Sequence, residues 1–282
     1  MSVRRIVIPI RGDGKGENVL AHAAVLARRY GAHVEALHCR PRSEDLLPYG
    51  VPIPAFLRKQ IEESSEGVAD QEEKTLYEEF TALLGPVGLT LGDDGPESAA
   101  WREAPGKQID VIKANGRLAD LIVVAKPDRF RNLGGNTLKA ALFNTGRPVM
   151  MCPMRDDHPK VLCDHVAIAW NGSTEAARAV ALTESIVTNA SQVTVLSGGE
   201  EVHGATSEDL IGFLKARGVD AHLERFDPVD GVGQTLLKRC DEMSADTLIM
   251  GAYSESHERE AVFGGNTQTV VDQAEMPVIF VH

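Results

Sequence analysis

The second half of the chain alternates short apolar runs with amphipathic stretches. The apolar runs have strand length and lie at about 165–170, 192–197, 220–226, 247–251 and 277–281. In the stretches between them, apolar residues recur at spacings of three and four, which is typical of a helix with one buried face. Strands that are apolar throughout and are separated by helices indicate a parallel sheet covered on both faces.

The first half repeats this pattern, because four of its segments match four segments of the second half in the same order. The matched pairs are "IVIPI" (6–10) with "VAIAW" (166–170), "HVEALH" (33–38) with "QVTVLS" (192–197), "ADLIVVA" (119–125) with "ADTLIMGA" (245–252), and Gly-Gly-Asn-Thr at 134–137 with the same tetrapeptide at 264–267. This order indicates a duplication. We therefore predict an α/β fold of two tandem flavodoxin-like or Rossmann-like domains, 1–154 and 164–282. Each has a five-stranded parallel sheet with helices on both faces.

The first half also carries a longer polar and helical segment, at about 40–84, between its second and third strands. Its "YGVPIPAF" (49–56) is proline-rich and predicts a loop, whereas "EEKTLYEEFTALLG" (72–85) predicts an amphipathic helix whose glutamates form a solvated face. Between the halves, "MRDDHPKVLCD" (154–164) is charged and contains a proline, which is typical of a linker.

Composition narrows the class of protein. The 282 residues are 43% hydrophobic and 25% charged, as in ordinary globular proteins, and no apolar run approaches the roughly 20 residues of a membrane-spanning helix. Four scattered cysteines without a C-x-x-C pair indicate reduced thiols in a cytoplasmic protein. The net charge of −12 argues against a nucleic-acid partner, because phosphate neutralisation needs clustered Lys and Arg. A small anion remains a candidate ligand, since helix N-termini can bind one locally.

The candidate site follows from the predicted sheet. In doubly wound folds ligands bind beyond the carboxyl ends of the strands, at the switch in strand order. There the fourth strand of the second half ends at Gly251, and the tetrapeptide at 264–267 opens a helix. Glycines permit close backbone approach, and free N–H groups at a helix start can cradle a phosphate.

These features resemble the universal stress protein family in its tandem form. The likeness covers nearly the whole chain and is strongest over 165–200 and 245–282, with "LIMGAYSESHEREAVFGG" before the last helix. In nucleotide-binding members the signature is G-x2-G-x9-G-[ST], whose loop and helix start hold the phosphates of ATP. An Asp at the end of the first strand contacts the adenine and ribose there. The resemblance implies a stress-response ligand sensor.

Position by position, the second half keeps the spacing of that signature but not every residue. Gly251 and Gly264 match the first and last glycines. Ser254 stands where the middle glycine belongs, and Gly265 stands where the hydroxyl residue belongs. Asn171 occupies the aspartate position, where it can hydrogen-bond a nucleoside without carrying charge.

The resemblance assigns a role to each of these positions if ATP binds, with Mg²⁺ accompanying it. The backbones of the loop and helix start hold the phosphates, two helix residues assist, and one residue at the end of the first strand contacts the nucleoside. In that order the residues are Gly251, Ser254, Gly264 and Gly265; Asn266 and Thr267; and Asn171.

The first half departs further from the signature. Ala125 replaces the first glycine, and the loop before Gly134 is shorter than its counterpart. Asp128 falls where the loop should approach phosphate, and Arg11 replaces the adenine-contacting aspartate. A carboxylate repels phosphate, so we expect no ATP in this half. Its Gly-Gly-Asn-Thr then serves as a tight turn into a helix.

Three functional hypotheses follow. The leading one is ligand sensing or partner binding rather than turnover, since the sequence shows no catalytic triad or paired carboxylates. The second is slow Mg²⁺-dependent ATP hydrolysis in the same pocket, and the third is an adaptor whose pockets are filled by side chains.

By the same resemblance, the final strands of the two domains are expected to pair with each other within the chain, and a homodimer stays open. The apolar "PVMMC" and "PVIFV" fit such an edge contact.

Overall fold

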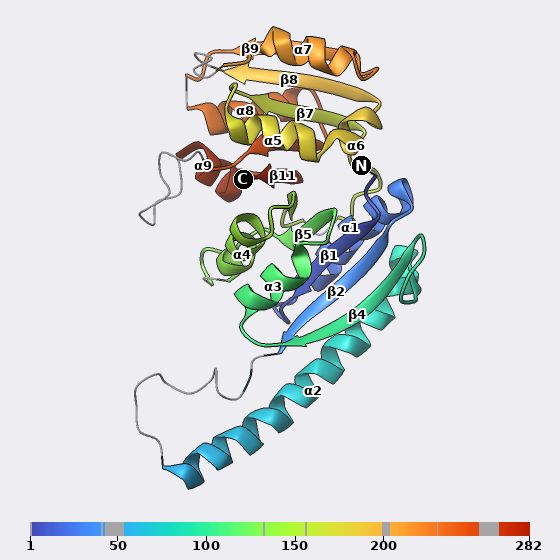
Figure 1. Cartoon of the computed structure of the whole chain (residues 1–282), viewed down its shortest axis with the longest axis vertical. Coiled ribbons are helices and arrows are strands. Elements are labelled where there is room, and N and C mark those ends of the chain that lie inside the picture. The colour runs from blue at the N-terminus through green and yellow to red at the C-terminus, as the bar shows by residue number, and fades with distance from the viewer. Residues whose placement is uncertain are drawn as a thin grey trace.

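A computed structural model describes residues 2–40, 42, 54–131, 133–155, 157–198, 204–229, 231–253 and 265–282, with the side chains of 58–66, 68 and 69 excepted. Its strands form one 11-stranded sheet in the order β3-β4-β2-β1-β5-β6-β11-β10-β7-β8-β9 (Figure 1). Among the helices of the described residues, none is long and apolar enough to cross a bilayer.

The first half alternates strands and helices as the sequence predicts. Its elements are β1 (Arg5–Ile10), α1 (Gly16–Tyr30), β2 (His33–Arg40), α2 (Ala55–Val87), β3 (Thr90–Leu91), β4 (Ser98–Pro105), α3 (Gln108–Gly116), β5 (Leu121–Ala125), α4 (Gly135–Thr145) and β6 (Val149–Cys152). The two-residue β3 makes this half six-stranded rather than five-stranded.

The second half has the five strands that the apolar runs predict, within one or two residues. Its elements are β7 (His165–Trp170), α5 (Thr174–Leu182), α6 (Glu184–Thr188), β8 (Gln192–Gly198), α7 (Ser207–Lys215), β9 (Ala221–Phe226), α8 (Val232–Glu242), β10 (Thr247–Gly251), α9 (Gly265–Gln273) and β11 (Val278–Val281).

Strand pairing confirms the doubly wound layout in both halves. All strand pairs within a half are parallel, and β1 and β7 lie in corresponding places: β1 lies between β2 and β5, and β7 lies between β8 and β10. The halves meet where β6 and β11 pair antiparallel, with Met150 opposite Ile279. The expected pairing of the final strands is therefore present within the chain, and it makes the two sheets continuous.

The apolar core lies on both faces of this sheet, because successive residues of a strand point to opposite faces. Ile6 and Ile8 join a cluster with residues of α1, α2, α5 and α7, whereas Val7 joins one with residues of α3, α4, α8 and α9. Both clusters run through the joint between the halves, where Met150 and Phe280 are fully buried.

One polar contact is repeated in the two halves. The carboxylate of Asp120, just before β5, accepts hydrogen bonds from the backbone N–H groups of Arg4 and Arg5 at 2.8 and 3.0 Å. Asp246, just before β10, likewise accepts from the N–H groups that start β7 at 2.9 Å each. The Asp of "ADLIVVA" and "ADTLIMGA" is therefore a structural residue that ties the strand after it, β5 or β10, to the first strand of its half.

The segments between the repeated elements differ in part from expectation. The helix predicted at 72–85 is the carboxyl-terminal part of α2, but Glu73 pairs with Arg40 at 3.3 Å rather than facing only solvent. The loop predicted at 49–56 lies outside the described residues up to 53, and the prediction is wrong at its end, where Ala55 and Phe56 begin α2. At the end of the predicted linker, Leu162 and Cys163 are buried, so this stretch packs against the second half.

Candidate functional site

The second half holds a cleft at the carboxyl ends of β7 and β10. Its volume is about 250 Å³. Five of the seven residues predicted to hold a nucleotide line it together: Asn171, Gly251, Gly265, Asn266 and Thr267. The other two, Ser254 and Gly264, lie outside the described residues. The structure thus brings together positions that are almost 100 residues apart in the sequence.

Asn171 lies directly after β7 and shapes the turn into α5. Its Oδ1 accepts a hydrogen bond from the backbone N–H of Ser173 at 3.1 Å, and the Ser173 hydroxyl caps α5 by accepting from Ala176 N–H at 3.2 Å. Short polar side chains favour such turns because they can replace backbone partners. Asn171 remains exposed at the cleft, so a ligand can reach its amide.

The two glycines of the site that the structure describes, Gly251 and Gly265, differ in the physical reason for the absence of a side chain. A Cβ on Gly251 would lie 2.6 Å from the backbone nitrogen of Ala176, so close packing of α5 on the end of β10 already requires glycine there. A Cβ on Gly265 would meet nothing within 4 Å. Gly265 begins α9, whose first N–H groups have no intrahelical partner, so the open space beside it can receive an anion.

Two side chains that the sequence reading missed narrow the cleft. The ring of Phe226 lies so close to Gly198 that a Cβ there would overlap it. Trp170 also lines the cleft, and its indole N–H donates to the carbonyl of Ala205 at 3.2 Å. Trp170 is the last residue of β7 and Phe226 is the last residue of β9. Their position at the carboxyl end of a strand was the feature of the sequence that could have predicted them as lining residues.

Glu175 is the acidic residue among the described lining of this cleft. It lies in the first turn of α5 and is 5% exposed. A carboxylate in the first turn is favoured by the positive end of the helix dipole. Since sequence reading treated this stretch as a helix start only, Glu175 was not among the candidates.

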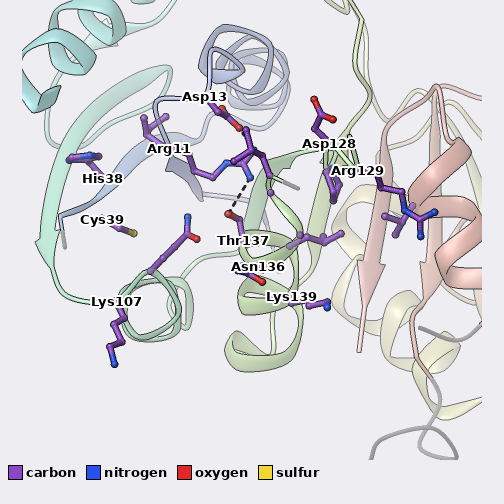
Figure 2. A pocket seen from close by; sticks show the side chains of 18 of the residues that line it. Arg11, Asp13, His38, Cys39, Lys107, Asp128, Arg129, Asn136, Thr137 and Lys139 are labelled. Carbon is purple, nitrogen blue, oxygen red and sulfur yellow. Dashed lines mark hydrogen bonds and ion pairs between the residues drawn. The ribbon is translucent and has the colours of Figure 1, made fainter. Parts of the chain in front are cut away.

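The corresponding place in the first half holds a larger cavity of about 820 Å³ (Figure 2). It lies beyond the carboxyl ends of β1, β2, β4 and β5 and reaches α9 of the second half. Its charged lining residues are Arg11, Asp13, Arg40, Glu72, Lys107, Asp128, Arg129, Lys139 and Asp272. Of these residues, the sequence pointed only to Arg11, which replaces the adenine-contacting aspartate of the signature, and to Asp128. Both were interpreted as arguments against ATP binding in this half.

Arg11 reaches across this cavity to the start of α4. Its guanidinium lies 2.5 Å from the Asp13 carboxylate and donates to Thr137 Oγ1 at 3.4 Å (Figure 2). Gly134 has φ +86°, and a Cβ there would overlap the guanidinium. Burial lowers the pKa of Arg11, and Asp13 opposes that shift. The first Gly-Gly-Asn-Thr therefore opens a helix, as predicted, and also makes room for an arginine.

Asp128 holds the shorter loop of the first half. Its Oδ1 accepts from the N–H groups of Phe130 and Arg131 at 3.0 and 3.1 Å, and an isolated bridge joins Asp128 to Leu133. The hydrogen bond from Arg131, together with nearby Lys15, lowers the pKa of this carboxyl. The carboxylate thus lines the cavity as expected, but backbone N–H groups already satisfy one of its oxygens.

Helix α9 lines both the second-half cleft and the first-half cavity. Its first residues, Gly265 to Thr267, line the second-half cleft, whereas Gln268, Val271 and Asp272 line the first-half cavity. Asp272 also accepts from Arg129 at 2.8 Å, which ties the first-half loop to the helix of the other half. The two pockets are therefore in contact with one rigid element.

Searches against known proteins show what the chain is similar to. No protein-family model matches the sequence, and no curated protein matches it significantly. A universal stress protein from Archaeoglobus fulgidus has a similar structure, with 16% identity, 100% of this chain and 99% of that chain covered, and a TM-score of 0.70. A putative universal stress protein from Pseudomonas aeruginosa has 17% identity, with 99% and 93% of the two chains covered, and a TM-score of 0.55.

A functionally unknown protein from Pseudomonas aeruginosa gives the same identity and TM-score, with 99% of this chain and 92% of that chain covered. The fold of these universal stress proteins therefore extends over the whole chain. This confirms the fold that the sequence resemblance implied.

Proposed function

We propose that this chain is a stress-response ligand-binding protein of the universal stress type, and that its second-half cleft binds an adenine nucleotide. One observation carries the proposal: residues from three separate segments, Asn171, Gly251 and Gly265 to Thr267, line a single cleft at the switch in strand order. The fold shared with universal stress proteins along the whole chain supports it.

In this proposal the phosphates lie at the start of α9, beside the open space at Gly265, and Asn171 contacts the nucleoside. Ser254 and Gly264 complete the phosphate loop. The cleft volume of about 250 Å³ is below the range of roughly 300–1,000 Å³ that is common for small-molecule pockets. The size therefore favours a mononucleotide whose phosphates remain partly exposed, and it argues against a dinucleotide.

Mg²⁺ fits this site as a companion of the nucleotide. Mg²⁺ in nucleotide sites is commonly held by one or two carboxylates together with the phosphates. Glu175 is the carboxylate at hand, and no group of three or more His, Cys, Asp or Glu residues in the described part of the chain could hold a metal by itself. The metal would therefore arrive with the phosphates and add charge neutralisation at the start of α9.

Two observations favour the alternatives to a nucleotide sensor. The Phe226 ring fills part of the cleft, as the adaptor hypothesis requires. Glu175 is a buried carboxylate beside the proposed phosphate position, and a hydrolase needs such a group to orient water. We favour binding without turnover because Glu175 lies in the first turn of a helix, where a carboxylate interacts favourably with the helix dipole without any catalytic role.

One experiment separates the three functions. Purified protein is denatured and released nucleotide is identified by chromatography, and then ATP with Mg²⁺ is titrated by calorimetry while phosphate release is followed. Saturable binding without phosphate release supports the proposal. Phosphate release that is lost in Glu175→Gln supports the hydrolase, and absence of both bound nucleotide and saturable binding supports the adaptor.

The repeated tetrapeptide offers a matched pair of variants for locating the nucleotide. Asn266→Asp places a carboxylate at the start of α9, and it should weaken binding at least about tenfold by repelling phosphate. Asn136→Asp makes the same change at the start of α4 and should leave nucleotide affinity unchanged. A tenfold loss in Asn136→Asp with no loss in Asn266→Asp would place the nucleotide in the wrong half for this proposal.

A further inference from the structure

We propose that the first-half cavity is a separate site for a small, multiply charged anion, bound by Arg11 between the N-termini of α3 and α4. The cavity volume of about 820 Å³ lies within the range of small-molecule pockets. This site is distinct from the nucleotide cleft, and its ligand is recognised by charge rather than by a base.

Two helices begin at this cavity. Lys107 and Gln108, at the start of α3, and Gly134 and Gly135, at the start of α4, all line it. Within the described residues, neither helix has a side-chain hydrogen bond from its N-cap position. The first N–H groups of a helix lack intrahelical partners and carry the positive end of its dipole, so both helix starts favour an anion in the same space.

Arg11 supplies the fixed charge. Its side chain is largely buried, and although Nη2 lies 2.5 Å from Asp13 Oδ2, neither atom has a partner with hydrogen-bond geometry in the part of the chain that the structure describes. Two oxygens of one ligand would satisfy the planar guanidinium better, because arginine binds carboxylate and phosphate through parallel hydrogen bonds. Figure 2 shows this side chain spanning the cavity toward Thr137, at the start of α4.

A second buried polar atom in the lining lacks a partner. His38 is 8% exposed, and its Nδ1 makes no hydrogen bond among the described residues, while its ring stacks on Trp101 at 5.5 Å. An unsatisfied buried nitrogen is costly, so it calls for a partner from a ligand or ordered water. With its proton on Nδ1, His38 would donate to an anionic oxygen.

The lining of the cavity is less acidic than the chain as a whole. The described lining of the cavity has five Lys or Arg residues and four Asp or Glu residues, although the whole protein has a net charge of −12. Several of these charges are paired with each other or with residues beside the cavity, and Arg40 pairs with Glu73 at 3.3 Å and with Glu103 at 3.4 Å. Asp272 pairs with Arg129 at 2.8 Å, Asp128 accepts two backbone N–H groups, and Asp13 lies against Arg11.

The site can be tested without interference from the nucleotide cleft, because each half contains one of the two tryptophans. Trp101 stacks on His38 beside the cavity, whereas Trp170 lines the second-half cleft. In the full chain with Trp170→Phe, Trp101 fluorescence is followed while pyrophosphate or citrate is added at constant ionic strength. Pyrophosphate tests a phosphate ligand and citrate tests a carboxylate ligand.

We expect at least one probe to give a saturable change, and Arg11→Met to weaken it about tenfold or more. Asn136→Asp should weaken it similarly, and it should not unfold the chain because an acidic residue in the first turn stabilises a helix. Asn266→Asp and the exposed Arg178→Met are the controls, and both should bind as the parent does.

Three results would overturn the proposal. They are no saturation by either probe at about 10 mM, equal affinity of Asn136→Asp and its parent, or an equal loss in Arg178→Met, which would show general charge attraction. Nucleotide binding is measured separately, in the complementary Trp101→Phe chain through Trp170. Failure of one site to bind therefore leaves the result for the other site unaffected.

Discussion

Truncation of Phe280 tests whether the two halves form one cooperative unit. Phe280 lies in β11, is fully buried, and stands opposite Val149 of β6 across the antiparallel joint. Phe280→Ala removes a ring from a core that continues from one half into the other, and such substitutions cost about 3–5 kcal/mol. Since a typical domain has about 5–15 kcal/mol of stability, the loss is a large fraction of the total.

Whether one half or both halves show this loss of stability depends on how strongly the β6–β11 pairing couples them. If β6 and β11 couple the halves, the urea midpoints reported by Trp101 and by Trp170 should coincide in the parent. Both should fall together in Phe280→Ala. The assay uses two single-tryptophan chains, Trp101→Phe and Trp170→Phe, each with and without the truncation. Leu118→Ala, at a side chain that is 72% exposed, is the control and should change stability by less than about 0.5 kcal/mol.

A split result would refute the reasoning. If Phe280→Ala lowered the midpoint seen by Trp170 and left that seen by Trp101 unchanged, the halves would unfold independently. The continuous sheet would then be a docking contact rather than a shared core. The domain division at 154–164 would in that case describe the energetics better than the single 11-stranded sheet does.

Three further predictions concern single side chains. Asp246→Ala should lower the free energy of unfolding in urea by about 2–4 kcal/mol, and Asp120→Ala should lower it by about 1–2 kcal/mol. The loss is smaller for Asp120 because the backbone N–H groups that donate to it are more exposed to water. Equal losses would contradict this. Gly251→Ala should lower stability by more than about 2 kcal/mol, since its Cβ would lie 2.6 Å from the backbone of α5, and an unchanged melting temperature would refute that packing argument. A hydrogen bond with Glu103 raises the pKa of Glu73 from 4.5 to about 7 in the folded chain, so the unfolded chain releases this proton first and stability should fall as pH rises from 4.5 to 7. Glu73→Gln should flatten that fall, and an unaltered pH profile would show that Glu73 does not titrate there.

Much of the fold could be predicted because its signals are local and repeated. Continuous apolar strands, helical spacing and the tetrapeptide at 134–137 and 264–267 recur in the same order, and each recurrence supports the other. The two-residue β3 gave no such signal, because Thr90 and Leu91 are both exposed and have no counterpart among the described strands of the second half.

The sites were less predictable because cavities depend on side chains from distant segments. Asn171, Gly251 and Gly265 were found through spacing within a known signature, which is a one-dimensional property. Phe226 and Glu175 were missed because their relevance depends on which strand ends and helix starts are neighbours in space. The larger first-half cavity was missed for the same reason, and because departures from a nucleotide signature were taken only as arguments against ATP.

The two halves share one backbone geometry but place different residues in it. Both place a glycine-rich helix start beside the end of a first strand, and the residue at that strand end decides what occupies the space between them. In the second half it is Asn171, whose short side chain bonds back to its own turn and leaves the cleft to be narrowed by Phe226. In the first half it is Arg11, which is long enough to reach the helix start and covers Gly134 with a guanidinium. Under our two proposals, a phosphate-binding turn and an arginine-filled turn have the same requirement, a glycine backbone that can be approached closely, and this shared requirement accounts for the tetrapeptide in both halves.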